Sequence, residues 1–142
     1  MNNFPILLVE DNKHDVRITR RAWRVNRISN KLHVVPNGQA CLDFLRNEGK
    51  YGDTKQYPRP GIILMDIRMP VMDGIECLQA IKSDPKLKIL PVIMLTTSKE
   101  DADRVRSYKL GCNTFIQKPV DFDKMVGAMK AIHLYWGLAE LP

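Results

Sequence analysis

Short apolar runs alternate along the chain with longer amphipathic segments, and several of these runs end on a polar or charged residue. Short continuous apolar runs predict strands buried on both faces, and helix-length segments between them predict the crossover helices of a parallel sheet. We therefore expect an α/β fold, a doubly wound five-stranded parallel sheet flanked by five helices. The strands are predicted near residues 5–9, 32–35, 61–65, 91–95 and 114–117, and the helices near residues 13–28, 38–47, 73–83, 100–109 and 121–136.

Helix starts and chain breaks are marked by residues with special backbone or capping properties. Asn37, Asp73 and Asp121 are predicted helix starts, because their side chains can accept a hydrogen bond from the first helical turn. Pro85 is expected to close the third helix. Residues 47–60 contain glycines and prolines among polar residues, which predicts a surface loop.

Reactive side chains of different kinds follow four of the predicted strands. Because the carboxyl ends of parallel strands form one edge of the sheet, where open α/β folds bind their ligands, we expect these side chains to converge. They are Glu10, Asp11, Asp66, Thr96 and Lys118.

The three carboxylates would repel one another strongly unless a cation lay between them. An oxygen-only site without His or Cys suits a hard ion, and Mg²⁺ is the expected one. Because Mg²⁺ is commonly completed by a phosphate oxygen, such a site is suited to receive a phosphoryl group. Asp66 is then the expected nucleophile, forming an aspartyl-phosphate. Thr96 is expected to donate to one phosphoryl oxygen and Lys118 to pair with another.

Four sequence motifs surround these site residues. They are Leu8-Val9-Glu10-Asp11-Asn12, Leu64-Met65-Asp66-Ile67-Arg68-Met69-Pro70-Val71-Met72-Asp73-Gly74, Leu95-Thr96-Thr97 and Phe115-Ile116-Gln117-Lys118-Pro119. In this order and at this spacing, they resemble the motifs of the receiver domains of two-component response regulators. The resemblance extends over almost the whole chain. It implies a flavodoxin-like receiver fold that accepts a phosphoryl group from a histidine kinase onto Asp66.

The resemblance also implies roles for individual residues. Glu10 and Asp11 would hold Mg²⁺ together with Asp66 and the backbone carbonyl of Arg68. Thr96 and Phe115 would form a switch coupled to phosphorylation. The domain would be a phosphoacceptor in signalling, with self-catalysed phosphotransfer and dephosphorylation, and not an enzyme acting on a separate substrate. The side chain of Arg68 would lie at the mouth of the site, where it either contacts the phosphoryl group or is solvated.

Two further segments resemble those of stand-alone receivers that partner phytochrome-like kinases. These are the long spacer from Asn47 to Pro60 and the ending from Leu134 to Pro142. The length of 142 residues predicts one receiver domain over 1–142, with 137–142 as a C-terminal tail and no room for an output domain.

Cysteine usage and hydropathy indicate the compartment. The chain has an odd number of cysteines without CxxC spacing, which predicts buried thiols in a reducing cytoplasm. They are Cys41, Cys77 and Cys112. No apolar run approaches membrane-spanning length, so we expect a cytoplasmic protein that does not bind membranes.

The predicted first helix gathers much of the formal net charge of +6 on one side. At about 100° per residue, its cations fall within a sector of roughly 120°. They are Lys13, Arg17, Arg20, Arg21, Arg24 and Arg27. This stripe could face an acidic protein surface such as a kinase, be simply solvated, or bind nucleic acid, although no nucleic-acid-binding motif accompanies it.

The predicted function is that of a single-domain response regulator with an unknown downstream protein target. An aspartate-nucleophile phosphatase would need a second acid two residues after Asp66, where Arg68 stands. The other alternative is a phosphorylation-independent receiver-like adaptor, with nucleic acid as one candidate partner, and the intact set of site residues disfavours it. Apolar residues near the C-terminus predict a homodimer, unless they fold back onto their own domain. They are Leu134, Tyr135, Trp136, Leu138 and Leu141.

Overall fold

The chain folds around one parallel sheet covered by helices on both faces. The computed structural model describes residues 4–96, 114–117 and 122–136. The sheet has the strand order β2-β1-β3-β4-β5, so its direction of winding reverses between β1 and β3. Its strands are β1 (Ile6–Val9), β2 (Leu32–Val35), β3 (Ile62–Asp66), β4 (Val92–Thr96) and β5 (Thr114–Gln117). The predicted doubly wound parallel sheet is confirmed.

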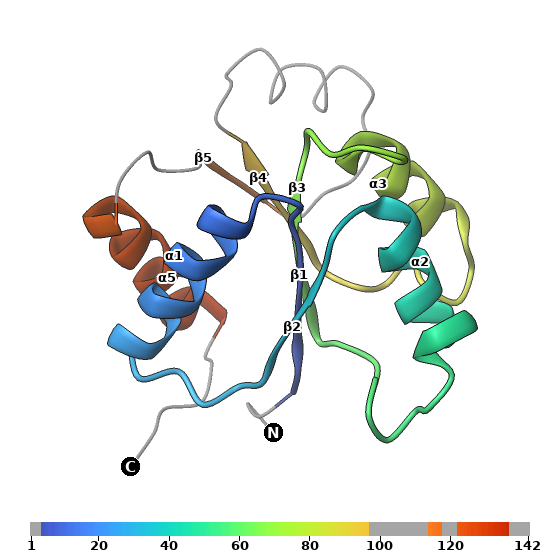
Figure 1. The fold of residues 1–142 in the computed structure, drawn as a ribbon, viewed down its shortest axis with the longest axis horizontal. Helices are drawn as coiled ribbons and strands as arrows, with labels where there is room; N and C mark the ends of the chain where they lie inside the picture. The colour runs from blue at the N-terminus through green and yellow to red at the C-terminus, as the bar shows by residue number, and fades with distance from the viewer. Residues whose placement is uncertain (1–3, 97–113, 118–121, 137–142) are drawn as a thin grey trace.

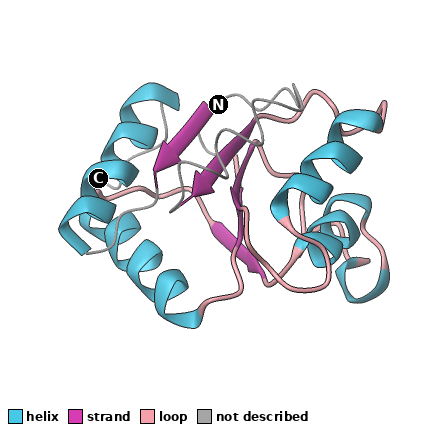
Figure 2. Ribbon diagram, turned by 90° about the horizontal axis from the view of Figure 1, so that it is seen from above, coloured by secondary structure: helices cyan, strands magenta, loops and turns pink. Residues whose placement is uncertain are grey.

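Helices α1 and α5 cover one face of the sheet, and α2 and α3 cover the other (Figures 1 and 2). Their bounds are α1 Lys13–Val25, α2 Gly38–Arg46, α3 Gly74–Ser83 and α5 Phe122–Trp136. The helix predicted near residues 100–109 lies outside the described residues. No helix in the described ranges is both long and apolar enough to cross a bilayer.

Alternate residues along β1, β3 and β4 serve two separate cores, as expected for strands buried on both faces. Leu7 and Val9 of β1 pack in the cluster beneath α2 and α3. Ile6 and Leu8 pack in the cluster beneath α1 and α5, together with Trp23 of α1. A shift of β1 by one residue would move each of its buried side chains to the other face of the sheet, so the register of this strand is fixed.

Side-chain caps explain where three of the helices begin. Asn37 accepts a hydrogen bond from the Ala40 N–H at the start of α2, and Asp73 forms a reciprocal capping box with Glu76 at the start of α3. Both starts were predicted from the sequence. At α1 the cap is Asn12, which accepts from the Asp15 N–H at 3.0 Å. The predicted start at Asp121 lies outside the described residues.

Helix α1 is shorter than the predicted range of 13–28 and ends at Val25. Arg27 has a left-handed backbone conformation with φ of 57°. The Ile28 N–H then reaches back to the Trp23 carbonyl at 3.2 Å, which closes the helix in a Schellman turn. The left-handed turn takes Arg27 out of the helical cation stripe that the sequence predicted.

The segment predicted as a surface loop over residues 47–60 is partly structured. It contains a short 3₁₀ helix, Gly49–Tyr51, and is fastened by Asn47, whose side-chain amide donates to the carbonyls of Tyr51 and Tyr57. The rings of Tyr51 and Tyr57 pack edge to face, with centroids 5.1 Å apart, and both contact Phe44 of α2. The loop is therefore closed by an aromatic cluster that also includes His33 of β2.

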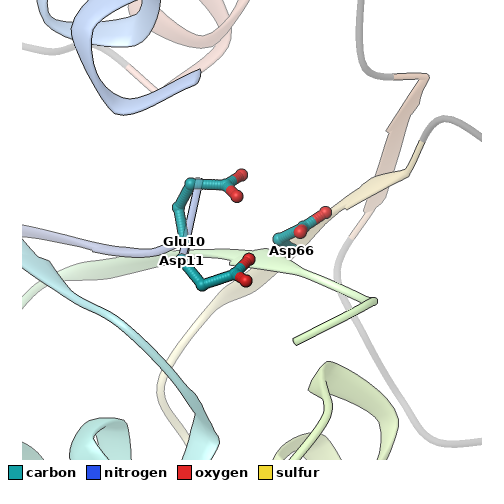
Figure 3. A group of neighbouring side chains, drawn as sticks. All are labelled: Glu10, Asp11 and Asp66. Carbon is teal, nitrogen blue, oxygen red and sulfur yellow. The ribbon is translucent and has the colours of Figure 1, made fainter. Parts of the chain in front are cut away.

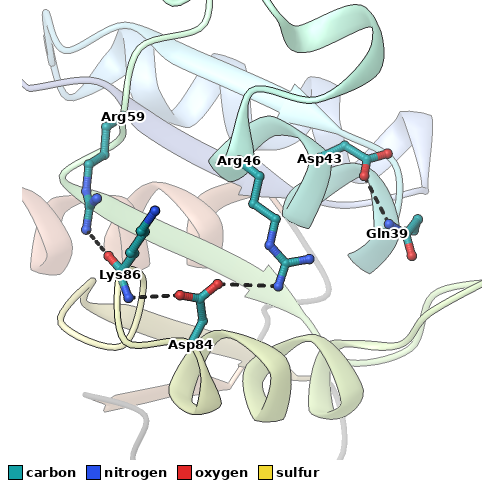
Figure 4. Close-up of polar contacts among 6 residues, drawn as sticks. All are labelled: Gln39, Asp43, Arg46, Arg59, Asp84 and Lys86. Atoms are coloured by element: carbon teal, nitrogen blue, oxygen red, sulfur yellow. Dashed lines mark hydrogen bonds and ion pairs between the residues drawn. The ribbon is translucent and has the colours of Figure 1, made fainter.

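Polar contacts on the surface join α2 and the end of the 47–60 loop to the turn that follows α3 (Figure 4). Arg46 lies 3.4 Å from Asp84, and Arg59 donates to the Lys86 carbonyl at 2.7 Å. The Lys86 backbone N–H, assisted by Arg46, lowers the pKa of Asp84. Because these groups are exposed or only partly buried, we expect them to contribute little to stability.

His33 gives the fold a predicted sensitivity to acid. Its Nε2 is buried and makes no hydrogen bond within the described residues, and burial, assisted by the charges of Lys31 and Arg20, lowers its pKa below 6.5. The folded state therefore favours the neutral ring, and protonation favours unfolding. The stability that the neutral His33 ring contributes is fully present above pH 6.5 and is lost as the pH falls through the lowered pKa of His33.

We expect the unfolding free energy of His33→Gln, measured by urea titration, to fall less than that of the parent between about pH 7.5 and about pH 5. His14→Gln, which removes an exposed histidine from α1, is the matched control and should keep the pH dependence of the parent. If the unfolding free energy of His33→Gln fell with decreasing pH as steeply as that of the parent, the assignment to His33 would be contradicted.

Candidate functional site

The register of the central strands brings three carboxylates to one edge of the sheet. Val9 pairs with Met65 across β1 and β3, so Glu10 and Asp11 leave β1 beside Asp66, the last residue of β3. The Glu10 N–H continues the sheet by donating to the Val35 carbonyl at 2.9 Å. One carboxylate oxygen from each of the three acids lies within 4.8 Å of the others. Figure 3 shows the three side chains grouped at the ends of β1 and β3, where the strand order reverses.

The three acids differ in their exposure to solvent. Glu10 is 3% exposed and Asp66 is 9% exposed, while Asp11 is exposed. The backbone N–H of Asn12 donates to Glu10 Oε1 at 3.1 Å, which orients the Glu10 carboxylate. Since Asn12 is also the cap of α1, the start of that helix and the position of Glu10 are set together.

Gly74 fixes the backbone next to Asp66. A Cβ atom at this position would collide with the Asp66 carbonyl oxygen and lie 2.9 Å from the Ile67 Cα. The Gly74 N–H donates to the Ile67 carbonyl at 2.8 Å. The first turn of α3 can therefore pack directly on the end of β3 only because residue 74 has no side chain.

The donor set fits a hard divalent cation. All three residues offer carboxylate oxygens, which Mg²⁺ and Mn²⁺ prefer to nitrogen or sulfur. In an octahedral Mg²⁺ site, opposite ligand oxygens are about 4.2 Å apart and adjacent ones about 3.0 Å apart. The three carboxylate oxygens, which lie within 4.8 Å of one another, would hold such an ion by closing onto it or through its bound waters.

The other predicted site residues are placed only in part. Thr96 is the last residue of β4, and its neighbour Leu95 pairs with Asp66, so the backbone of Thr96 lies at the same edge of the sheet as the end of β3. Phe115 lies in β5, opposite Met94. The side chains of Thr96 and Phe115, and all of Lys118, lie outside the described residues. Arg68 is described and its side chain is exposed.

Helix α1 carries five of the six predicted cations on its exposed side, and they are Lys13, Arg17, Arg20, Arg21 and Arg24. Lys13, Arg17 and Arg20 line a cavity of about 550 Å³ that extends from Glu10 and Asp11 along the edge of β2. Its remaining walls are apolar and come from Val16, Val34, Val35 and Pro36.

Arg21 differs from the other cations of the helix, because its guanidinium lies 4.4 Å from the centre of the Phe122 ring of α5. It serves packing between the two helices as well as surface charge.

Sequence reasoning gave neither Asn12 nor Gly74 a role at the site. Both stand beside the predicted acids in the chain, and an Asn directly before a helical pattern and a Gly after Asp73 were the available signals. Cys41 and Cys77 are buried free thiols as predicted, and the Cys77 thiol together with burial raises the pKa of Cys41. Cys112 lies outside the described residues.

Comparison with known proteins agrees with this geometry. Residues 6–130 match the family model described as response regulator receiver domain. The chain is 36% identical to the response regulator Rcp1 of Synechocystis sp. over 131 residues, covering 92% of this chain and 87% of the relative. It is 35% identical to the probable methanogenesis regulatory protein FilR2 of Methanothrix harundinacea, covering 94% of this chain and 83% of that protein.

Solved structures show the same fold. The phosphorylated cyanobacterial phytochrome response regulator RcpA superimposes with a TM-score of 0.84 at 36% identity, covering 94% of each chain. The Mn²⁺-bound form of Rcp1 superimposes with a TM-score of 0.82 at 35% identity, covering 98% of this chain and 99% of the other. With a doubly wound sheet, an acidic cluster at its switch point and these matches over nearly the whole length, the chain belongs to the response regulator receiver family.

Proposed function

We propose that the chain is a single-domain response regulator in which Asp66 accepts a phosphoryl group from a histidine kinase in an Mg²⁺-dependent reaction. Receiver domains are signalling domains, and phosphorylation-based signalling is what membership of the family implies. The observation that carries the proposal is the convergence of Glu10, Asp11 and Asp66 within 4.8 Å at the sheet edge. The Mn²⁺ in the similar Rcp1 structure supports a divalent cation here.

In the proposed reaction, an Asp66 carboxylate oxygen attacks the phosphorus of the phosphohistidine. The new O–P bond forms as the P–N bond breaks, and the bonding electron pair stays on the imidazole nitrogen. Glu10, Asp11 and Asp66, with the Arg68 carbonyl, would hold Mg²⁺, which when bound neutralises charge on the carboxylates and the phosphoryl oxygens. Thr96 and Lys118 are proposed to contact the remaining phosphoryl oxygens, and Thr96 with Phe115 to carry the switch.

The proposed phosphodonor is a kinase of the phytochrome-linked kind, since relatives with that association are similar over nearly the whole chain. The exposed cations of α1 border the acidic cluster, so a donor that reaches Asp66 comes close to them. Opposite charges on the donor would accelerate association. We propose a cytoplasmic location for both proteins.

We also propose that phosphorylation tightens a homodimer. The chain would signal through protein contacts, made by the face that includes β5 and α5 and by the apolar C-terminal residues. Helix α5 extends to Trp136. Leu138 and Leu141 lie outside the described residues.

Asp66→Asn should abolish labelling by acetyl phosphate, because the amide is a poor nucleophile and the cluster loses one charge. The measurement is intact mass after incubation with acetyl phosphate and Mg²⁺. Asp123→Asn, which changes an exposed carboxylate of α5, is the matched control and should be labelled like the parent. A phosphoryl adduct that persists in Asp66→Asn, or forms equally well in EDTA, would refute the proposal.

Charge reversal of Arg17, Arg20 and Arg24 should slow phosphotransfer from the kinase by about tenfold or more at low salt, since steering weakens with ionic strength. Labelling by acetyl phosphate should not change. Arg21 is left intact because it packs on Phe122.

The control for this charge reversal changes three exposed lysines away from α1 to Glu and should transfer at the parental rate. They are Lys55, Lys86 and Lys88. Equal loss with both phosphodonors would show damage to the site. Salt-sensitive binding of duplex DNA by the parent would instead favour a nucleic-acid partner.

Light scattering should show a dimer for the protein treated with beryllofluoride and Mg²⁺. Trp136→Ala, or a chain ending at His133, should shift the mass toward the monomer because apolar contact area is lost. Ile89→Ala, an exposed apolar change away from α5, should leave the dimer intact. A monomer at every protein concentration, with and without beryllofluoride, would exclude the proposed dimer.

A further inference from the structure

The cavity between α1 and the end of β2 has two walls of different chemical character. The exposed cations Lys13, Arg17 and Arg20 line one wall, and apolar side chains that include Val34 and Pro36 line the other. Its volume of about 550 Å³ lies within the range of about 300–1,000 Å³ that is typical of small-molecule pockets. A cavity of this size and lining suits a small ligand that carries both negative charge and an apolar ring.

The three cations form one row along α1. Residues spaced i, i+4 and i+7 lie on the same face of a helix, and the row from Lys13 to Arg20 extends over about 10 Å. Within the described ranges, none of the three cations forms an ion pair. A single carboxylate on a ligand reaches only part of this row, whereas two linked phosphates contact two neighbouring guanidinium groups.

The acids at the other end of the cavity set the orientation of such a ligand. Glu10 and Asp11 line the cavity beside Lys13, and without a metal ion their carboxylates repel phosphate groups. Arg17 and Arg20 lie farther along the helix, about one and two turns after Lys13. Their planar guanidinium groups match phosphate oxygens in pairs of parallel hydrogen bonds. The phosphates are therefore favoured at the two arginines and not at the acidic end.

The apolar wall provides a surface for a flat ring. Val34 is half-buried and Pro36 is exposed, and both line the cavity at the end of β2. A nucleobase that lies against these side chains removes apolar surface on both partners from water.

From this lining we infer that the cavity binds a nucleoside diphosphate, with its phosphates on Arg17 and Arg20 and its base against the apolar wall. The two ends of the ligand then contact separate elements, the phosphates on α1 and the base at the end of β2. The inference does not depend on the proposed function, because no atom of Asp66 takes part.

The test measures binding of ADP to the full chain by isothermal titration calorimetry at low salt. The buffer contains EDTA, so that neither the acidic cluster nor ADP holds a metal ion. The parent should bind one ADP. Arg17→Gln and Arg20→Gln should each bind ADP about tenfold more weakly, because each loses charge-assisted hydrogen bonds to a phosphate.

Arg24→Gln is the matched control. Arg24 is an exposed arginine of the same helix that does not line the cavity. Its substitution removes the same charge and should leave the affinity for ADP unchanged.

Pyrophosphate tests the apolar wall. The parent should bind pyrophosphate about tenfold more weakly than ADP, because the contact of the base is missing. Val34→Thr keeps the β-branched shape of the strand residue but places a hydroxyl in the apolar wall. It should weaken binding of ADP about threefold and leave binding of pyrophosphate unchanged. Amide chemical shifts induced by ADP should be largest in residues 13–20 and 34–36.

The inference would be overturned if the parent showed no saturable binding of ADP, or if Arg17→Gln and Arg20→Gln kept the parental affinity. Equal weakening in Arg24→Gln would show attraction to the net charge of the helix and no defined site. Equal affinity of the parent for ADP and pyrophosphate would exclude a nucleotide site, and so would chemical shift changes confined to residues outside the cavity.

Discussion

Electrostatic repulsion among Glu10, Asp11 and Asp66 is the constraint that the rest of the site depends on. Charges about 4 Å apart near a protein surface interact by about 4 kcal/mol, and here one oxygen from each carboxylate lies within 4.8 Å of the others. What resists separation is the pairing of Val9 with Met65, the two buried cores on either side of β1, and the Asn12 N–H on Glu10. The scaffold thus holds a concentration of negative charge that a cation at the sheet edge would relieve.

Much of the fold could be predicted because its strands are buried on both faces. The predicted bounds of β2 and β5 agree with the structure, and the caps at Asn37 and Asp73 follow from side chains that compete for the first N–H groups of a helix. The predicted end of α1 was wrong, because the helix ends at a left-handed Arg27 and no residue preference in the sequence indicates that conformation. The aromatic closure of the 47–60 loop involves His33 and Phe44, which precede that loop in the sequence.

The convergence of the three acids could be predicted for a topological reason. Parallel strands end at one edge whatever their separation along the chain, so Glu10 and Asp66 meet without any local signal. The roles of Asn12 and Gly74 depend instead on individual hydrogen bonds and close backbone contacts, which arise only in the folded chain. The contributions of Thr96, Phe115 and Lys118 remain predictions.

Helices α1 and α5 are joined by more than apolar packing. The Asn26 side-chain amide bridges the carbonyls of Ala22 and Val126, and Arg21 stacks on Phe122. These contacts make the two helices one layer, in which a shift of either helix breaks polar bonds to the other. A kinase docked on α1 and a second copy assembled on α5, as proposed, would therefore contact two neighbouring helices of the same layer. The geometry of each complex is then constrained by the other, even though the two partners need share no contact residue.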